Sequence, residues 1–442
     1  MNKGPEERQI LRRFKPYPAY KDSGVEWLEE IPAHWEVKRL KHAAPIRRKM
    51  AEKTGDAPYL GLEHIESWTG RLLLDAQPET VESVVVSFTA GDVLFGKLRP
   101  YLAKVARPDF SGVCTSELVV MNPTGQCSQE YLFYCLLNPT FIRWIDSLTY
   151  GTKMPRVSPD HLAATAIPLP PTDEQRAIVA FLDRETAKID ALVAKKQRLI
   201  ELLQEKRTAL ITRAVTKGLD PEVPMKDSGV EWLGEIPAHW EVTRLKRLGS
   251  LQAGAGFPEE EQGIPDEELP FFKVGDMVLS PDEKHIETAP NSVSRQTARR
   301  LRAFIFPAGA IVFPKVGAAL KLNRRRILTT PSCIDNNMMG FIPGSCDHNW
   351  AFYWLSGLDL GELANPGAVP SVNEGQVREL PVAIPPDHEQ RTIAAFLDRE
   401  TAKIDALIAK IREGVERLKE YRTALISAAV TGKIDVRDEA AS

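Results

Sequence analysis

The chain has few cysteines, and their arrangement excludes several classes of protein. Among 442 residues there are five cysteines, and no two of them form a C-x-x-C pair. A disulfide framework or a cysteine-rich zinc site is therefore not expected, and a reducing compartment fits better. The amino terminus carries charges and prolines where a signal peptide would need an apolar core. No apolar run approaches membrane-spanning length, so we expect a soluble cytoplasmic protein without a membrane partner.

Catalytic signatures are missing as well. There is no G-x-x-x-x-G-K-[ST] phosphate loop, no G-x-S-x-G turn, no H-E-x-x-H pair and no histidine cluster at metal-ligand spacing. The Asn-Pro pairs are not followed by Pro-Tyr or Pro-Phe, so the tetrapeptide with which amino-methyltransferases hold a target base is absent. We therefore predict no catalytic residue, no metal ligand and no cofactor in this chain. Because the net charge is only -3, any binding of nucleic acid has to come from local basic patches.

What the chain does contain is an internal repeat. The twelve letters FLDRETAKIDAL at residues 181–192 recur without change at residues 396–407. A second motif, KDSGVEWL-x-EIPAHWEV, begins at Lys21 and again at Lys226. The tryptophans of this motif read as the seal of a core, and its histidines, His34 and His239, read as structural. The chain is therefore interpreted as two copies of one unit.

Each FLDRETAKIDAL motif lies in a long predicted helix. Thr172 can cap the first of these helices while Gln175 reaches back to it, and Gly218 and Gly432 stand where left-handed turns would end the two helices. About 45 residues at roughly 1.5 Å each give rods of about 65 Å. Apolar residues recur every seven positions, which predicts a coiled-coil seam: Leu182, Ile189, Leu203, Leu210, Leu397, Ile404, Ile411, Leu418 and Leu425.

We expect the two helices to pair with each other as an antiparallel coiled coil, because their lengths and registers match. The alternative is two separate surface helices, each packed on its own domain. Between the repeated motifs lie divergent segments of about 115 residues, the size of an ordinary domain, with short runs typical of strands and one amphipathic helix each. The predicted fold class is α+β: two α/β domains joined by two long helices in a pseudo-twofold repeat. The predicted segments are a lead at 1–20, a domain at 21–165, a helical spacer at 166–220, a domain at 221–380, a second spacer at 381–435 and a tail at 436–442.

Local basic patches fall inside the two variable domains. Lysine and arginine in loops beside glycines can approach phosphates closely, and an arginine can pair with the edge of a guanine. The bland alternative is that such patches occur on any soluble protein whose surface is rich in charge. The candidate DNA-binding residues are Lys97, Arg99, Tyr101, Lys104, Lys153 and Arg156 in the first domain, and Arg295, Arg299, Lys315, Lys321 and Arg324 in the second. The neighbouring Arg325 and Arg326 belong to the same patch.

Taken together, these motifs resemble the specificity subunit of a type I DNA restriction-modification system. The resemblance covers essentially the whole chain and rests on the repeated KDSGVEWL-x-EIPAHWEV motif, on GDVLFGKLRPYLAK from Gly91, and on IPLPPTDEQRAIVAFLD from Ile167 with its echo IPPDHEQRTIAAFLD from Ile384. The P-P-x-x-E-Q-x-x-I-x-x-F-L-D pattern in duplicate is specific to that family. One departure is that the second domain has GAIVFPKVGAALK and lacks the Arg-Pro-Tyr of residues 99–101.

The resemblance implies a non-catalytic addressing subunit that reads a bipartite, asymmetric sequence in double-stranded DNA with two target recognition domains. It implies two methyltransferase subunits that dock on the helices, carry S-adenosylmethionine and methylate adenine, and restriction and translocation subunits that use ATP and Mg²⁺. Readers held about 40 to 60 Å apart would span roughly 12 to 18 base pairs. The alternative function is a coiled-coil scaffold that holds other proteins and reads no DNA sequence, which the slightly acidic composition favours.

Overall fold

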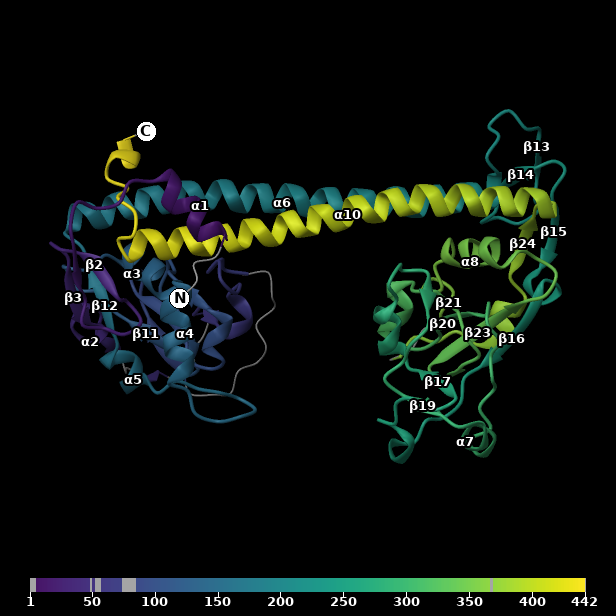
Figure 1. Ribbon diagram of the computed structural model, residues 1–442, viewed down its shortest axis with the longest axis horizontal. Helices are drawn as coiled ribbons and strands as arrows, with labels where there is room; N and C mark the ends of the chain where they lie inside the picture. The colour runs from purple at the N-terminus through teal and green to yellow at the C-terminus, as the bar shows by residue number, and fades with distance from the viewer. Residues whose placement is uncertain (1–4, 48–49, 52–56, 74–84, 366–368, 442) are drawn as a thin grey trace. The chain divides into compact units, whose positions relative to one another are not determined.

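The computed structural model describes residues 5–47, 50–51, 57–73, 85–365 and 369–441. The chain divides into two compact units (Figure 1): unit 1 comprises Met1–Gln197 and Ile411–Ser442, and unit 2 comprises Arg198–Lys410. The division passes through both long helices, so each helix contributes one end to each unit. The segment boundaries expected from the sequence stay predictions. Across the described residues, none of the helices combines the length and the apolar character needed to span a lipid bilayer.

The two long helices are α6 (Thr172–Lys217) and α10 (Asp387–Val430), of 46 and 44 residues. Both occupy the predicted positions and have the predicted length. Each is followed by a glycine in the left-handed region, with φ of +73° at Gly218 and +71° at Gly432. Glycine adopts this conformation without the steric cost that a Cβ atom would bring. The sequence therefore predicted correctly where α6 and α10 end at their C-terminal sides.

Ends of the two helices lie side by side within each unit. In unit 1, Arg422 of α10 donates two hydrogen bonds to the carboxylate of Asp190 on α6, at 2.9 and 3.4 Å. In unit 2, Arg207 of α6 donates to Asp405 of α10 at 3.0 and 3.3 Å. Residue numbers rise on α6 from the first pair to the second and fall on α10. The two helices are therefore antiparallel, as the repeat predicted.

The predicted seam residues are buried to different degrees. Most of them are buried: Leu182, Ile189, Leu397, Ile404, Ile411 and Leu425. The remaining three, Leu203, Leu210 and Leu418, are partly buried. Two isoleucines next to the seven-residue register, Ile200 and Ile408, are buried too. The apolar stripe that is removed from water is thus wider than the strict seven-residue pattern, as in helices that also pack against a domain.

Unit 1 contains two four-stranded sheets, with strand orders β4-β11-β8-β9 and β5-β7-β10-β6, and the two-stranded pairs β1-β2 and β12-β3. Helices α3 and α4 lie beside them, each capped by the residue before it, because Ser128 and Asn138 accept hydrogen bonds from the first free backbone amides. The helices are α1 (Pro5–Arg13), α2 (Leu40–Ala43), α3 (Gln129–Leu136), α4 (Pro139–Ser147), α5 (Pro159–Ala164) and the short 3-10 turns η1 (Leu62–His64), η2 (Pro100–Leu102) and η7 (Asp438–Ala441).

The strands of unit 1 are β1 (Tyr20–Asp22), β2 (Glu30–Pro32), β3 (Glu36–Arg39), β4 (Ile46–Arg47), β5 (Met50–Ala51), β6 (Tyr59–Leu60), β7 (Val85–Phe88), β8 (Val93–Gly96), β9 (Val105–Ala106), β10 (Gly112–Thr115), β11 (Leu118–Met121) and β12 (Ala166–Leu169). Strand β12 leads into α6 and pairs antiparallel with β3. The repeated EIPAHWEV segment is thereby joined to the start of the long helix.

Unit 2 has the same plan with a larger sheet, β16-β23-β20-β21-β18, and a smaller one, β19-β17-β22. Its helices are α7 (Arg295–Arg300), α8 (His348–Ser356), α9 (Glu374–Arg378) and the 3-10 turns η3 (Leu245–Arg247), η4 (Glu259–Glu261), η5 (Val274–Leu279) and η6 (Ala318–Leu322). Its strands are β13 (Met225–Asp227), β14 (Glu235–Pro237), β15 (Glu241–Arg244), β16 (Gly249–Ala253), β17 (Leu269–Phe272), β18 (His285–Ile286), β19 (Ser292–Val293), β20 (Ile311–Pro314), β21 (Arg326–Leu328), β22 (Cys333–Ile334), β23 (Met338–Pro343) and β24 (Pro381–Ile384). Strand β24 pairs with β15, as β12 pairs with β3.

A single glutamate fastens the EIPAHW motif to the start of each long helix. In unit 1, the Trp35 indole donates to Glu174 at 2.8 Å, and the His34 ring lies 2.6 Å from the other oxygen of that carboxylate. Trp35 is fully buried. The second copy repeats both contacts, through Trp240, His239 and Glu389. Trp35 and Trp240 thus seal a core and each histidine is bound by its glutamate, as the sequence predicted. The prediction is wrong for Trp232, which is 48% exposed, and Trp27 is only partly buried.

The glutamine that follows this glutamate has a different partner from the one expected. Gln175 does not reach back to Thr172, which is already part of α6. Its amide donates to the carbonyls of Gln126 and Pro170 at 2.8 and 2.9 Å, and its oxygen accepts from the Ser128 amide at 3.0 Å. Gln175 therefore satisfies backbone groups of the loop before α3 and of Pro170, which a capping prediction based on local spacing does not detect. In the second copy the equivalent contacts run from Gln390 to Pro385 and Asp347.

Candidate nucleic-acid interface

Two basic loops of the first domain, separated in sequence, come together in unit 1. The Lys97 carbonyl, directly after β8, accepts a hydrogen bond from the Val157 amide at 3.0 Å. Two residues later the Arg99 amide donates to the Pro155 carbonyl at 2.7 Å. The loop after β8 and the loop before α5 therefore form one surface. We call it the unit 1 basic surface, and its predicted members are Lys97, Arg99, Tyr101, Lys153 and Arg156.

The unit 1 basic surface combines an unusual backbone with exposed aromatic side chains. Arg99 has a φ of +48°, a left-handed conformation that costs a residue with a side chain about 1 kcal/mol or more. Residues held in such conformations are concentrated at functional sites. Tyr101 is 44% exposed and Tyr150, on the second loop, is 62% exposed. Sequence reasoning missed Tyr150, although its position next to a glycine and a basic loop is the signal that could have identified it.

Two candidates of this region are engaged inside the domain. The Lys104 ammonium donates to the carbonyls of Leu62 and Ile65 at 2.6 and 2.9 Å, and burial lowers the pKa of Lys104. Lys104 thus holds the η1 turn against the strand after η2, in place of the predicted outward-facing charge. The Arg156 guanidinium forms an ion pair with Glu117 at 3.2 Å. Its charge is therefore partly neutralised, which leaves Lys97, Arg99 and Lys153 as the stronger candidates for phosphate or base contacts.

The second domain repeats two backbone hydrogen bonds of this loop with other side chains. The Lys315 carbonyl, directly after β20, accepts from the Val372 amide at 2.9 Å. Two residues later the Gly317 amide donates to the Pro370 carbonyl at 2.8 Å. Gly317 also has a positive φ, +77°, but its ψ of -166° differs from the ψ of 63° at Arg99. The departure noted in the sequence is therefore a change of side chain and of local backbone conformation within the same hydrogen-bond pattern.

The arginine run that follows η6 is only partly exposed. Lys321 is exposed and Arg324 partly buried. Arg325 and Arg326 are 2% and 3% exposed, so their assignment to a DNA-binding patch is wrong. Burial lowers the pKa of Arg325 to about 9, and Arg326 forms an ion pair with Glu283 at 2.6 Å. A run of like charges reads as a surface in a sequence, but the strand β21 turns two of its members inward.

The remaining candidates lie on α7, which packs against β19 and is capped by Ser294. Arg299 is exposed. The Arg295 guanidinium lies 3.8 Å from Glu268, and more than half of each of these side chains is exposed. On the same helix Arg300 contacts Glu261 at 2.5 Å. Glu268 and Glu261 thus neutralise part of the α7 charge, so α7 is a weaker candidate surface than the loop after β20.

No group of histidine, cysteine, aspartate and glutamate side chains suited to holding a metal ion is found among the described residues. All five cysteines are free, and only Cys346 is not fully buried. Burial raises the pKa of Cys127 to about 12. Such thiols pack as small apolar groups and do not act as nucleophiles near neutral pH.

Comparison with known proteins connects this architecture to one group. The profile described as the type I restriction modification DNA specificity domain matches residues 32–202 and again residues 237–417. The type I restriction enzyme MjaVIII specificity subunit of Methanocaldococcus jannaschii is 24% identical over 441 residues, which covers 92% of this chain and 95% of that protein. The EcoDI specificity subunit of Escherichia coli is 27% identical over 261 residues, or 58% of this chain and 52% of that protein.

A solved structure from work on complex assembly and conformational transition of the type I R-M system also matches. Its TM-score is 0.63 at 21% identity, covering 90% of this chain and 98% of that one. This similarity shows a shared fold. The two stretches matched by the profile each contain one variable domain and the first part of one long helix. The duplication read from the sequence is therefore confirmed.

Proposed function

This chain belongs to the family of type I restriction-modification DNA specificity subunits, and from that premise we propose that its two variable domains each read one half of a split, asymmetric DNA sequence. The observation that carries the proposal is the matched pair of loops after β8 and β20. Both loops have the same backbone hydrogen bonds, but one carries Arg99 where the other carries Gly317. Matched hydrogen bonds place the two loops at equivalent positions of their domains, and unequal side chains select different bases.

The charges of these loops suit two kinds of contact. Lysines on flexible stems, such as Lys97, Lys153 and Lys315, act as point charges that neutralise phosphates and fix the position of a protein on the duplex. The planar guanidinium of Arg99 can pair with a base edge through two hydrogen bonds. We assign Arg99 to base recognition and the lysines to phosphate contacts. The exposed Tyr101 and Tyr150 provide apolar surface beside them.

The chemistry is assigned to partner subunits. Methyltransferase subunits, two for each chain, would supply S-adenosylmethionine and transfer its methyl group to adenine, while restriction and translocation subunits would use ATP and Mg²⁺. The exposed surface of α6 in unit 2 supports docking of a partner. Leu199 and Leu202 are 44% and 46% exposed there. A groove of about 1000 Å³ on the same helix is lined by Glu201, Gln204, Glu205, Thr208, Ala209, Thr212, Arg213, Thr216 and Lys217.

The decisive experiment is a map of methylated adenines in DNA treated with the chain and its methyltransferase partner. The expected result is methylation at one split sequence whose two halves differ. A hybrid chain in which residues 221–380 are replaced by a second copy of residues 21–165 should methylate a symmetric sequence built from the first half alone. Methylation without sequence preference would overturn the proposal.

The alternative, a coiled-coil scaffold without sequence recognition, gives a different salt dependence. Contacts to phosphates release counterions, so binding of the assembled complex to duplex DNA should weaken steeply as salt rises. A scaffold whose partners alone contact DNA would show the same salt dependence after Lys97, Lys153 and Lys315 are replaced by alanine.

A further inference from the structure

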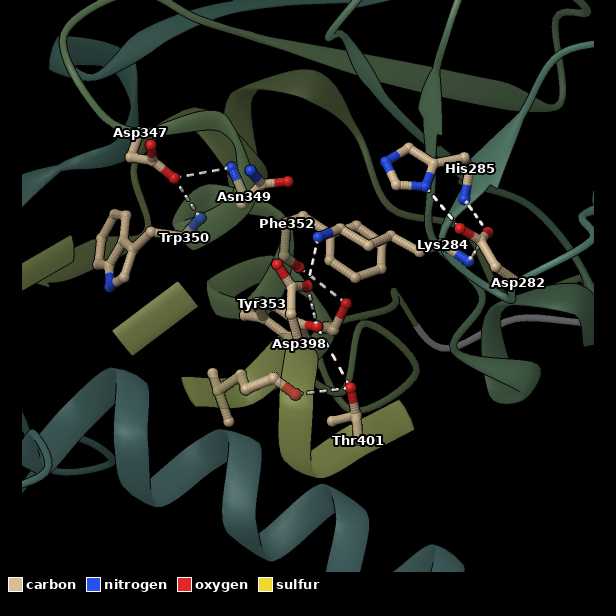
Figure 2. Close-up of polar contacts among 12 residues, drawn as sticks. Asp282, Lys284, His285, Asp347, Asn349, Trp350, Phe352, Tyr353, Asp398 and Thr401 are labelled. Atoms are coloured by element: carbon tan, nitrogen blue, oxygen red, sulfur yellow. Dashed lines mark hydrogen bonds and ion pairs between the residues drawn. The ribbon is translucent and has the colours of Figure 1, made fainter. Parts of the chain in front are cut away.

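One aspartate of the second FLDRETAKIDAL motif is a meeting point of three elements in unit 2 (Figure 2). Asp398, on α10, accepts a hydrogen bond from the hydroxyl of Tyr353 on α8 at 2.6 Å. The same carboxylate oxygen accepts from the ammonium of Lys284 at 2.5 Å. The Lys284 side chain is only 13% exposed and lies over the rings of Phe352 and Tyr353, 5.7 and 5.2 Å from their centres. Lys284 is thus held by an anion and by two aromatic faces.

The residues beside Lys284 are themselves ordered by a local network. Asp282 accepts from the amides of Lys284 and His285 at 3.0 and 2.7 Å, and its second oxygen lies 2.6 Å from the His285 ring (Figure 2). Partial burial alone would raise the pKa of Asp282, but the hydrogen bonds from His285 and from the backbone lower it to about 2. Asp282 therefore stays charged near neutral pH and keeps the turn before β18 closed, with Lys284 aimed at α10.

Unit 1 contains the counterpart of this arrangement, built from other residues. Asp183, at the same place in the first FLDRETAKIDAL motif, accepts from the hydroxyl of Tyr134 on α3 at 2.6 Å. The same oxygen accepts from the guanidinium of Arg107 at 2.9 Å. Arg107 lies over the rings of Phe133 and Tyr134, 5.1 and 5.9 Å from their centres. We call these two arrangements the Asp183 joint and the Asp398 joint.

The cation of each joint comes from the sheet that carries the candidate DNA-binding loop. Arg107 directly follows β9, which pairs with β8, and β8 runs into Lys97. Lys284 directly precedes β18, which pairs with β21, and β21 pairs with β20, which runs into Lys315. The cations differ in type and enter from different strands, yet they end on equivalent aspartates. Each joint therefore connects a reading sheet to a spacer helix at the same point of the repeat.

We propose that Asp183 and Asp398 are positioning residues that fix the orientation of each reading sheet on its spacer helix, and thereby set the half-site selectivity of that domain and the gap between half-sites. This inference rests on the proposed function. The carboxylates suit this role because Asp183 and Asp398 are 42% and 43% exposed, so they contribute little to the buried core. Two hydrogen bonds that converge on one oxygen restrict rotation, whereas apolar packing alone allows small shifts.

The test uses the complex assembled with its methyltransferase partner and a set of duplexes in which the gap is native or changed by one base pair, with each half-site intact or altered. Asp398→Ala should lower the preference for the native gap and for the half-site read by unit 2 by about tenfold, a part of the roughly 100-fold that a full 1 Å misplacement can cost. Selectivity at the other half-site should be retained. Asp183→Ala should give the mirror result.

Three further variants separate positioning from folding. Lys284→Met removes the cation of the Asp398 joint and should lose selectivity. Lys284→Arg supplies the type of cation found in the Asp183 joint and should retain most of that selectivity. Tyr353→Phe keeps the ring and removes one donor, so it should give an intermediate loss. Equal reduction of methylation on every duplex, with unchanged preferences, would show a merely structural role and overturn the inference. A wild-type complex without sequence preference would overturn the proposed function and this inference with it, whereas a selective wild type with equally selective variants overturns the inference alone.

Discussion

Replacing Arg99 by glycine should reduce DNA selectivity without weakening the fold. The φ of +48° at Arg99 is unfavourable for any residue with a Cβ, and relief of this strain is worth about 1 to 2 kcal/mol. Part of this stabilisation is lost, because glycine raises the conformational entropy of the unfolded chain by an amount worth roughly 0.5 to 1 kcal/mol. The Arg99→Gly variant should therefore unfold with an unchanged free energy, or with one raised by up to about 1.5 kcal/mol.

The matched control is Arg99→Ala, which removes the same guanidinium but keeps the strain. The two variants should lose selectivity equally, by about 1 to 3 kcal/mol at one base pair of the first half-site if Arg99 pairs with a base. They should differ in stability by about 1 kcal/mol, with glycine the more stable. Urea unfolding measures the stability. Competition for methylation between duplexes that differ at single positions measures the selectivity. A glycine variant less stable than the alanine variant would refute the account of the loop, and a loss spread evenly over all sequences would refute base recognition by Arg99.

Three other predictions follow from the contacts described above. Arg422→Ala should destabilise the helix pair more than Arg207→Ala, by about 1 to 2 kcal/mol, because the Arg422 side chain is 7% exposed and that of Arg207 is 26% exposed. Hydrogen exchange of the helix peptides in each unit measures both effects. Equal effects would contradict the expectation that the more buried ion pair contributes more to stability. Alkylation of Cys127 at pH 8 should be slow until the chain is unfolded, because burial raises its pKa to about 12; fast labelling of the folded chain would argue against the packing. Insertion of four residues after Lys196 together with four after Ile411 adds about one helical turn, or 6 Å, to each spacer. The insertion should lengthen the unread gap between the half-sites by about one or two base pairs. An unchanged gap in the methylation map would show that the helices do not set this distance.

Much of the scaffold could be predicted from the sequence because it is written twice. The repeated FLDRETAKIDAL motif predicted two long helices of equal length, and the glycines after them predicted where the helices end. Both predictions depend on local physics: apolar periodicity and the left-handed conformation that Gly218 and Gly432 adopt. Antiparallel pairing followed from matched registers, and the ion pairs of Arg207 and Arg422 have that geometry.

The contents of the candidate interface were harder to predict, because charge alone does not tell which way a side chain points. Arg325 and Lys104 look like their exposed neighbours in the sequence, yet both are engaged within the domain. Arg325 is buried with its guanidinium over the Phe313 ring, and the Lys104 ammonium donates to two carbonyl groups. The meeting of the Lys97 and Lys153 loops depends on strand pairing between distant segments. Gln175 was assigned a local partner, whereas its real partners are the backbone groups of a loop almost fifty residues away.

The two copies of the repeat are alike in the side chains that hold elements together. They differ in the side chains of the loops after β8 and β20. Glu174 and Glu389 each bind the equivalent tryptophan and histidine of their own copy. Asp183 and Asp398 each accept a hydrogen bond from the equivalent tyrosine hydroxyl. In the loops after β8 and β20 the backbone bonds agree, but Arg99 faces solvent in one and Gly317 has no side chain in the other. Under the proposed function, fastening and reading therefore use different residues. A substitution in the loop after β8 or β20 would then change the bases that are selected without loosening the joints, and one scaffold would carry two unrelated addresses.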